Sequence, residues 1–116
     1  MTKQEIRAEL YFKINSIDWH FFHWHFRQYH PSHNNEHPLA KSIIDCCYLC
    51  EQKMPGYASN FIDTLCSISG REYFNPHYDQ LLQLLAELLV VAHLANVFDD
   101  TWIFEEEPTI GESNKN

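Results

Sequence analysis

Residues 2–24 read TKQEIRAELYFKINSIDWHFFHW, and their apolar positions decide the fold class. Six of these positions form one stripe of a helical wheel, at spacings of 4, 4, 3, 4 and 3 residues: Ile6, Leu10, Ile14, Ile17, Phe21 and Trp24. Thr2 followed by Glu5 fits a capping box at the start of this helix. The helix should end before Pro31, because a residue preceding proline is pushed out of the α region. We therefore predict a helix over residues 2–29.

Three further segments complete the predicted fold. Pro38 suits the first turn of a helix over residues 38–54, which Pro55-Gly56 ends. A short helix is predicted over residues 58–69 and a long one over residues 76–97. No segment alternates as a strand does, so the chain is predicted to be all-α, a compact bundle of about four helices. We expect the first and fourth helices to form its spine.

The last predicted helix differs from an ordinary amphipathic one. Residues 81–95 read LLQLLAELLVVAHLA, which is apolar nearly all round, with Gln83 and Glu87 as the exceptions. A helix of this kind is central in a bundle or shared between subunits.

Length and charge divide the 116 residues into a body and a tail. The length fits one domain, which we place at residues 1–98. Of the formal net charge of −8, the larger part lies in an acidic tail over residues 99–116, with six acids against one lysine. No basic run attracts a phosphate backbone, so nucleic acid is not an expected partner.

The cysteines and the N-terminus indicate a cytoplasmic setting. Cys46, Cys47 and Cys50 lie on one predicted helix, where neighbouring cysteines rarely have disulfide geometry. The N-terminus lacks the apolar segment of a signal peptide. No uninterrupted apolar run approaches the roughly 18 residues of a spanning helix, so we expect no membrane association.

The end of the first predicted helix carries a second aromatic stripe. Continuing the helical wheel places Trp19, Phe22, Phe26 and Tyr29 on another face than the core stripe. Either both faces lie inside the bundle, or the second one is an interface, because exposed aromatic patches mark partner sites. A lone bundle helix seldom buries two faces.

Histidines form a third stripe on the same predicted helix. His20 and His23 are three residues apart and His30 follows seven later, a spacing that can converge on one metal ion. Arg27 lies in the middle of this stripe and opposes a cation. Metal binding through these histidines is therefore one alternative function. The simpler interpretation is that the histidines are solvated or hydrogen-bonded within the protein.

An Arg-x5-His spacing occurs twice, at Arg27 to His33 and at Arg71 to His77. It resembles the Arg-x4–6-His motif of the HEPN family, small all-α bundles that include metal-independent ribonucleases. The resemblance implies that Arg71 and His77, from two subunits, act at the RNA 2′-hydroxyl and phosphate. Glu72 departs from the polar Asn, Asp or His that usually follows the arginine.

We expect a non-catalytic protein-interaction or accessory subunit that presents an aromatic face of its first helix to a protein partner or to a second copy. No catalytic residue and no cofactor belong to this expectation. The HEPN-like ribonuclease and the histidine-based metal site are its two alternatives.

Overall fold

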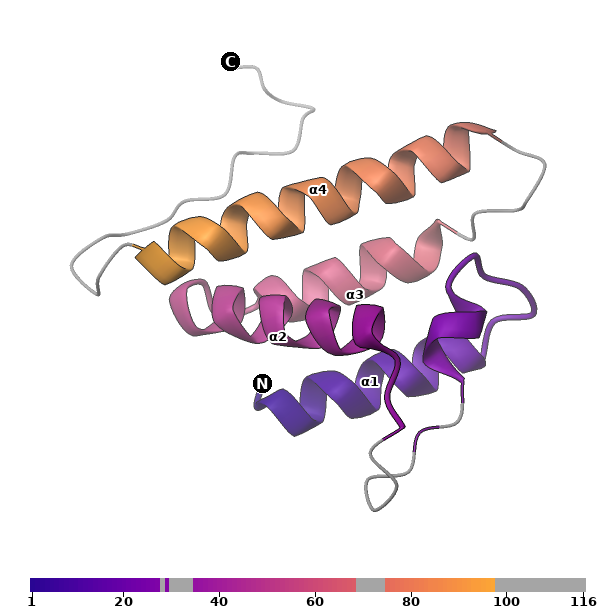
Figure 1. Cartoon of the computed structure of the whole chain (residues 1–116), viewed down its shortest axis with the longest axis horizontal. Helices are drawn as coiled ribbons and strands as arrows, with labels where there is room; N and C mark the ends of the chain where they lie inside the picture. Colours follow the sequence, from indigo (N-terminus) through magenta and orange to yellow (C-terminus); the bar gives the residue numbers. More distant parts are fainter. Residues whose placement is uncertain (28, 30–34, 69–74, 98–116) are drawn as a thin grey trace.

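The computed structural model describes residues 1–27, 29, 35–68 and 75–97, with backbone only for residues 75–77. The elements follow one another as α1 (Lys3–Asn15), the 3₁₀ helix η1 (His23–Phe26), α2 (Pro38–Lys53), α3 (Tyr57–Ser67) and α4 (Asn75–Val97). The described residues contain no strand, and the helices form one layered bundle (Figure 1). The predicted all-α class is confirmed, and the last three helices begin and end within two residues of their predicted bounds. The predicted acidic tail lies outside the described residues.

The N-terminal half of α1 forms as predicted. Thr2 Oγ1 accepts a hydrogen bond from the Glu5 amide at 3.1 Å, and the Glu5 carboxylate accepts one from the Thr2 amide at 2.8 Å. This capping box satisfies amides that a helix start leaves without partners. One turn apart along the same face, Ile6, Leu10 and Ile14 are fully buried. The first half of the predicted apolar stripe is therefore the core face of α1.

The prediction of one continuous helix over residues 2–29 is wrong. The helix ends at Asn15, whose side-chain amide donates to the Tyr11 carbonyl at 2.7 Å and to the Phe26 carbonyl at 2.8 Å. Ser16 Oγ donates to the Phe12 carbonyl. Such short polar side chains compete with the helix for backbone partners. The chain turns here and η1 folds back, so that the rings of Tyr11 and Phe26 lie 5.1 Å apart.

The turn changes which aromatic side chains are buried. Phe21 and Trp24, predicted to be core residues, are 37% and 60% exposed. Phe22 and Phe26, which were assigned to the other stripe, are 4% and 0% exposed. A helical wheel no longer applies beyond Asn15, because the chain leaves the helix there.

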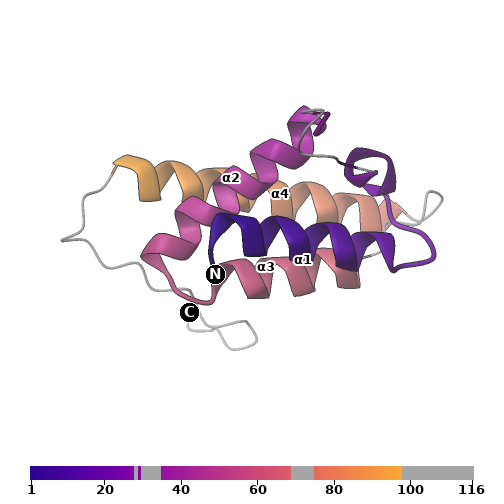
Figure 2. The same cartoon turned by 90° about the horizontal axis from the view of Figure 1, so that it is seen from below.

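The centre of the bundle is α2. It packs against α1, α3, α4 and η1, whereas α1 and α4 scarcely touch each other. Figure 2 shows α1 beside α3 and α2, with α4 on the far side of them. The predicted spine of first and fourth helices is therefore wrong. Five residues from one broad side of α2 supply the centre of the core: Ala40, Ile43, Ile44, Cys47 and Cys50.

A buried carboxylate connects α2 to α3. Glu51, 9% exposed, accepts hydrogen bonds from the amides of Gly56 and Ala58, and from the amino group of Met1 at 2.9 Å. Gly56 has a φ of 97°, which favours glycine. These bonds and the amino group lower the pKa of Glu51, although its burial opposes them. The ionised side chain thus caps the start of α3 from the preceding helix.

Candidate functional site

The inner face of α4 is narrow. Four residues are at most 6% exposed and follow one another at spacings of 7, 4 and 3, which form a single stripe: Leu81, Leu88, Ala92 and Ala95. Leu84, Leu85 and Val91 flank this stripe and are half-buried. Among the described elements, α2 is the main neighbour of α4. One helix therefore covers only one side of α4.

The outer side of α4 is also apolar. Six large apolar side chains there are between 38% and 59% exposed: Tyr78, Leu82, Leu89, Val90, Leu94 and Val97. We call these six residues the α4 outer face. Their exposed side chains add up to roughly 500 Å² of apolar surface. This is the size of the largest apolar patch on an ordinary monomer, and such a patch is often functional.

Aromatic residues from the turn after α1 extend this face at one end. The ring of Phe21 meets that of Tyr78 edge to face at 5.0 Å. Trp19, 36% exposed, lies next to Phe21 with 6.4 Å between ring centres. The apolar surface therefore runs from α4 onto the segment that separates α1 from η1.

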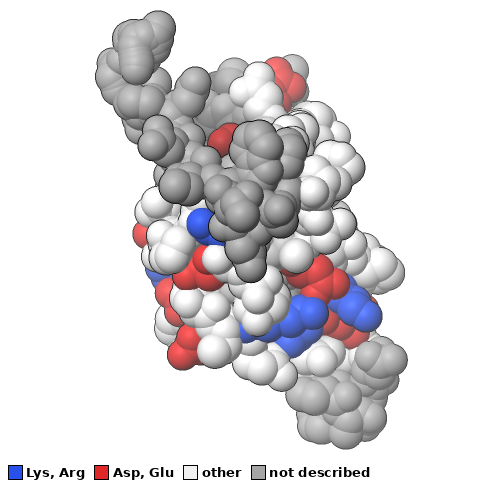
Figure 3. All heavy atoms as spheres, turned by 90° about the vertical axis from the view of Figure 1, so that its left-hand side faces the viewer, with Lys and Arg blue, Asp and Glu red and all other residues white. Residues whose placement is uncertain are grey.

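Charge is sparse on α4. The helix contains Asp79 and Glu87 but neither lysine nor arginine. In Figure 3 the charged side chains gather at the height of α1 and α2, and the described surface above them, toward α4, is mostly uncharged. The outer face is therefore suited to contact apolar groups rather than a polyanion.

One helix has the length and the composition of a membrane span. Residues 78–97 have a mean hydropathy of 1.5 and the length of a span, and 22% of this stretch is buried in the bundle. The uninterrupted apolar runs are short, as expected, but Gln83 and Glu87 do not bring the mean hydropathy of the stretch below that of a membrane span. This property rests on length and composition alone.

The predicted aromatic interface is not one face. Phe22 and Phe26 lie in the core, so they are unavailable to a partner of the folded chain. Tyr29 is half-buried, and its ring stacks on Tyr11 with 5.7 Å between centres. Of the four predicted residues, only Trp19 is exposed.

The two described histidines of the predicted metal site bond to the backbone. His20, 2% exposed, accepts a hydrogen bond at Nδ1 from the Phe22 amide, 3.0 Å away. Its Nε2 lies 2.9 Å from the Leu65 carbonyl and therefore carries the proton in the neutral ring. This leaves His20 without a lone pair for a metal. His23 Nε2 bonds to the Ile14 carbonyl at 2.9 Å, and His30 lies outside the described residues.

The surroundings of His20 lower its pKa. Burial lowers its pKa, and the nearby His23 adds to this effect, while the bond to Leu65 opposes it. Within the described ranges, no group of three or more His, Cys, Asp or Glu side chains is arranged to hold an ion. The contacts therefore give His20 a structural role, as a clamp between the turn after α1 and the end of α3.

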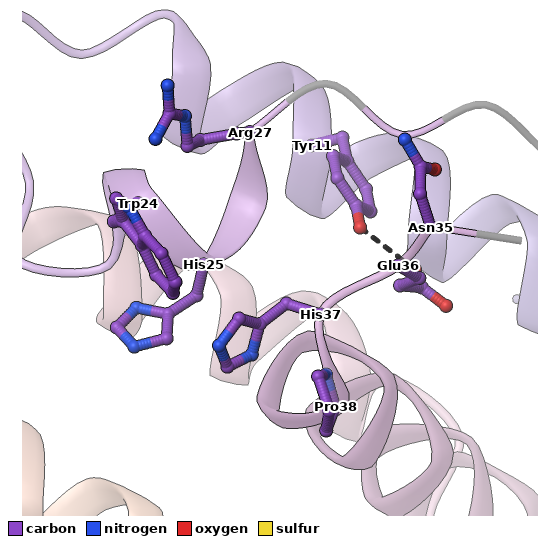
Figure 4. Close-up of a pocket in the computed structure, with 8 residues that line it drawn as sticks. All are labelled: Tyr11, Trp24, His25, Arg27, Asn35, Glu36, His37 and Pro38. Carbon is purple, nitrogen blue, oxygen red and sulfur yellow. Dashed lines mark hydrogen bonds between the residues drawn. The ribbon is translucent and has the colours of Figure 1, made fainter.

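A separate polar pocket lies where η1 meets the start of α2 (Figure 4). It has a volume of about 380 Å³ and is lined by Tyr11, Trp24, His25, Arg27, Asn35, Glu36, His37 and Pro38. The Glu36 carboxylate is already occupied, since it accepts from the Tyr11 hydroxyl at 3.0 Å and from Arg7 Nε at 3.0 Å.

The histidine rings of this pocket lie edge to face, 4.8 Å apart. His37 Nδ1 accepts from the Leu39 amide at the start of α2. Burial lowers the pKa of His25, and His37 adds to the effect. The His37 ring therefore caps the start of α2, and the His25 ring packs against it.

The residues of the HEPN-like motif fall mostly outside the described residues. Arg71 and His33 lie there, and only the backbone of His77 is described, in the first turn of α4. Arg27 is exposed at the rim of the polar pocket. The described part of the chain therefore leaves this alternative untested.

The thiols are not set up as nucleophiles. Burial raises the pKa of Cys50 to about 12 and also raises the pKa values of Cys46, Cys47 and Cys66. A raised pKa keeps a thiol protonated and unreactive at neutral pH.

The α4 outer face carries a sequence signal that a helical wheel does reveal, namely apolar residues nearly all round the helix. What the wheel does not reveal is which side α2 covers.

Comparisons of the chain with protein-family models, with curated proteins and with solved structures each gave no match.

Proposed function

We propose that this chain is a non-catalytic protein-interaction subunit that docks through the α4 outer face, extended by Phe21 and Trp19. The single observation that carries the proposal is the exposure of six large apolar side chains on one side of a 23-residue helix. The proposed docking surface is therefore on α4, instead of on the aromatic stripe expected from the sequence.

The exposure is unfavourable for an isolated chain. At about 25 cal/mol per Å², roughly 500 Å² of apolar surface in water represents on the order of 12 kcal/mol that a perfectly covering partner would recover. Only a fraction of this becomes affinity, because association loses translational and rotational freedom.

The surface also has the anatomy of a docking site. Leu89 and Val90, each 59% exposed, are central along α4, while Asp79 and Glu87 supply polar flanks. Interfaces typically combine an apolar centre with a polar rim, and their centre is depleted in charge.

Capture experiments on three forms of the full chain test the proposal. Wild type, Leu89→Glu and the control Phe12→Glu would each be tagged and purified from their host. Phe12 is 71% exposed on α1, so the control introduces the same charge at an exposed apolar site away from α4.

Wild type and Phe12→Glu should retain a protein at constant stoichiometry, a second copy of the chain included, and Leu89→Glu should lose it. Equal retention by all three forms would contradict the proposal. Circular dichroism of each variant shows whether the fold persists, which we expect because both positions are solvent-exposed.

A further inference from the structure

Four residues of α4 repeat with the spacing of a helix-pairing seam. Leu82, Ala86, Leu89 and His93 follow one another at intervals of 4, 3 and 4 residues, and all four are exposed. This is the heptad spacing with which one helix meets another. The seam lies on another side of α4 than the inner stripe that packs on α2, so a second helix can contact it without displacing α2.

We propose that the occupant of this seam is α4 of a second copy, running antiparallel. This inference rests on the proposed function and specifies its partner. Taken in order, antiparallel pairing places Leu82 opposite His93 and Ala86 opposite Leu89. In each of the two central layers, the small side chain of Ala86 then lies opposite the large side chain of Leu89, as close packing requires.

The same register matches the residues beyond the seam. It places Tyr78 opposite Val97, two exposed members of the α4 outer face. Asp79 and Asn96, the next heptad positions at the two ends, also come opposite each other, and both are exposed. A side-chain amide can donate a hydrogen bond to a carboxylate, so the polar ends of the two copies complement each other.

Parallel pairing in register fits less well. It places Ala86 against Ala86, His93 against His93, and Asp79 against Asp79. The alanine layer leaves space that nothing fills, two facing imidazoles repel each other once both are protonated, and the two carboxylates repel at neutral pH. Antiparallel pairing also opposes the two helix dipoles favourably.

The charge on α4 favours a copy of the chain over a lipid surface. Helices that lie in a membrane interface are rich in lysine and arginine, whereas α4 has neither and carries Asp79 and Glu87. Glu87 lies off the seam and Asp79 faces Asn96, so like charges do not meet where two copies touch. The two outer faces together offer at most roughly 1,000 Å², which is the size range of weak, transient interfaces.

Sedimentation velocity of the full chain tests whether the second copy binds. Wild type and Phe12→Glu should form dimers in the micromolar range. Leu89→Glu, which buries one carboxylate from each copy in the two central layers of the pair, should raise the dissociation constant at least about 100-fold.

Disulfide formation tests the direction. A mixture of Leu82→Cys and His93→Cys chains of different mass should form the mixed disulfide, and neither variant should cross-link alone above the wild-type background of its native cysteines. Cross-linking of each variant with itself would establish parallel pairing and overturn the antiparallel assignment.

Two outcomes separate this inference from the proposed function. A chain that stays monomeric, while the captured partner is a different protein lost in Leu89→Glu, would overturn the second copy and leave the docking surface standing. Monomers that co-sediment with vesicles of phosphatidylcholine and phosphatidylglycerol, in a manner abolished by Leu89→Glu, would overturn both in favour of a lipid surface.

Discussion

Replacing His20 by alanine should destabilise the fold strongly, because its ring is buried and both ring nitrogens are hydrogen-bonded. The substitution removes two hydrogen bonds, to the Phe22 amide and to the Leu65 carbonyl, each contributing about 1 kcal/mol. It also leaves a void at a site that is 2% exposed, which costs about 1 kcal/mol more. The expected loss is roughly 3 kcal/mol, a large share of the stability of a domain of this size.

Urea unfolding followed by circular dichroism measures this loss. With a slope of about 1–3 kcal/mol per M, the midpoint should fall by roughly 1–3 M. His23→Ala is the comparison, because it removes one hydrogen bond at a half-buried site and should cost about 1 kcal/mol. A loss for His20→Ala no larger than that for His23→Ala would refute the structural role of His20.

The same residue should make stability depend on pH. The pKa of His20 is lower in the fold than its unfolded value near 6.5, so the unfolded chain binds the proton more readily. The contribution of His20 to the free energy of unfolding is fully present above pH 6.5. It is lost as the pH falls below that value toward the pKa of His20 in the folded chain. This loss should shrink in His20→Ala. Stabilisation of wild type by added zinc, absent in His20→Ala, would instead show that the ring is a ligand.

Three other perturbations follow from the described contacts. Glu51→Ala leaves the buried Ala58 amide without its acceptor and should lower the free energy of unfolding by about 2–3 kcal/mol, measured in urea at pH 7; a loss under about 0.5 kcal/mol would contradict the capping role. Thr2→Ala removes the capping box and should cost about 1 kcal/mol by the same assay, with no change in the slope of unfolding. Cys50, fully buried with its pKa raised to about 12, should react with a thiol reagent at least about ten times more slowly than the half-buried Cys46, and mass-mapped labelling at equal rates in the native state would count against its burial.

The start of the fold could be predicted from the sequence because its signals are local. The capping box of Thr2 and Glu5 and the burial of Ile6 and Leu10 depend on residues within a few positions of each other. The end of α1 could not be predicted from periodicity, since the apolar spacing continues unbroken past Asn15. Its side chain ends the helix by bonding to the Phe26 carbonyl, a partner 11 residues away that only the folded chain supplies.

The proposed docking surface was only half predictable for a similar reason. The sequence predicts that α4 is apolar on most sides, and that such a helix is central or shared. It does not say that α2 covers only the stripe of Leu81 and Leu88, because the choice of neighbour depends on how three other helices pack. The aromatic stripe was misplaced once the chain left the helix, which buried Phe22 and Phe26.

Site-specific photo-cross-linking tests the central claim most directly, because it reports which side of α4 a partner touches. A photoreactive residue would be placed at Leu82, at Leu89, at Glu87 on the same helix but off the seam, and at Phe12 on α1. Docking through the α4 outer face predicts strong adducts to a protein at the two leucines, and weak ones at Glu87 and Phe12. Equal yields at all four positions, or adducts at Phe12 alone, would contradict it.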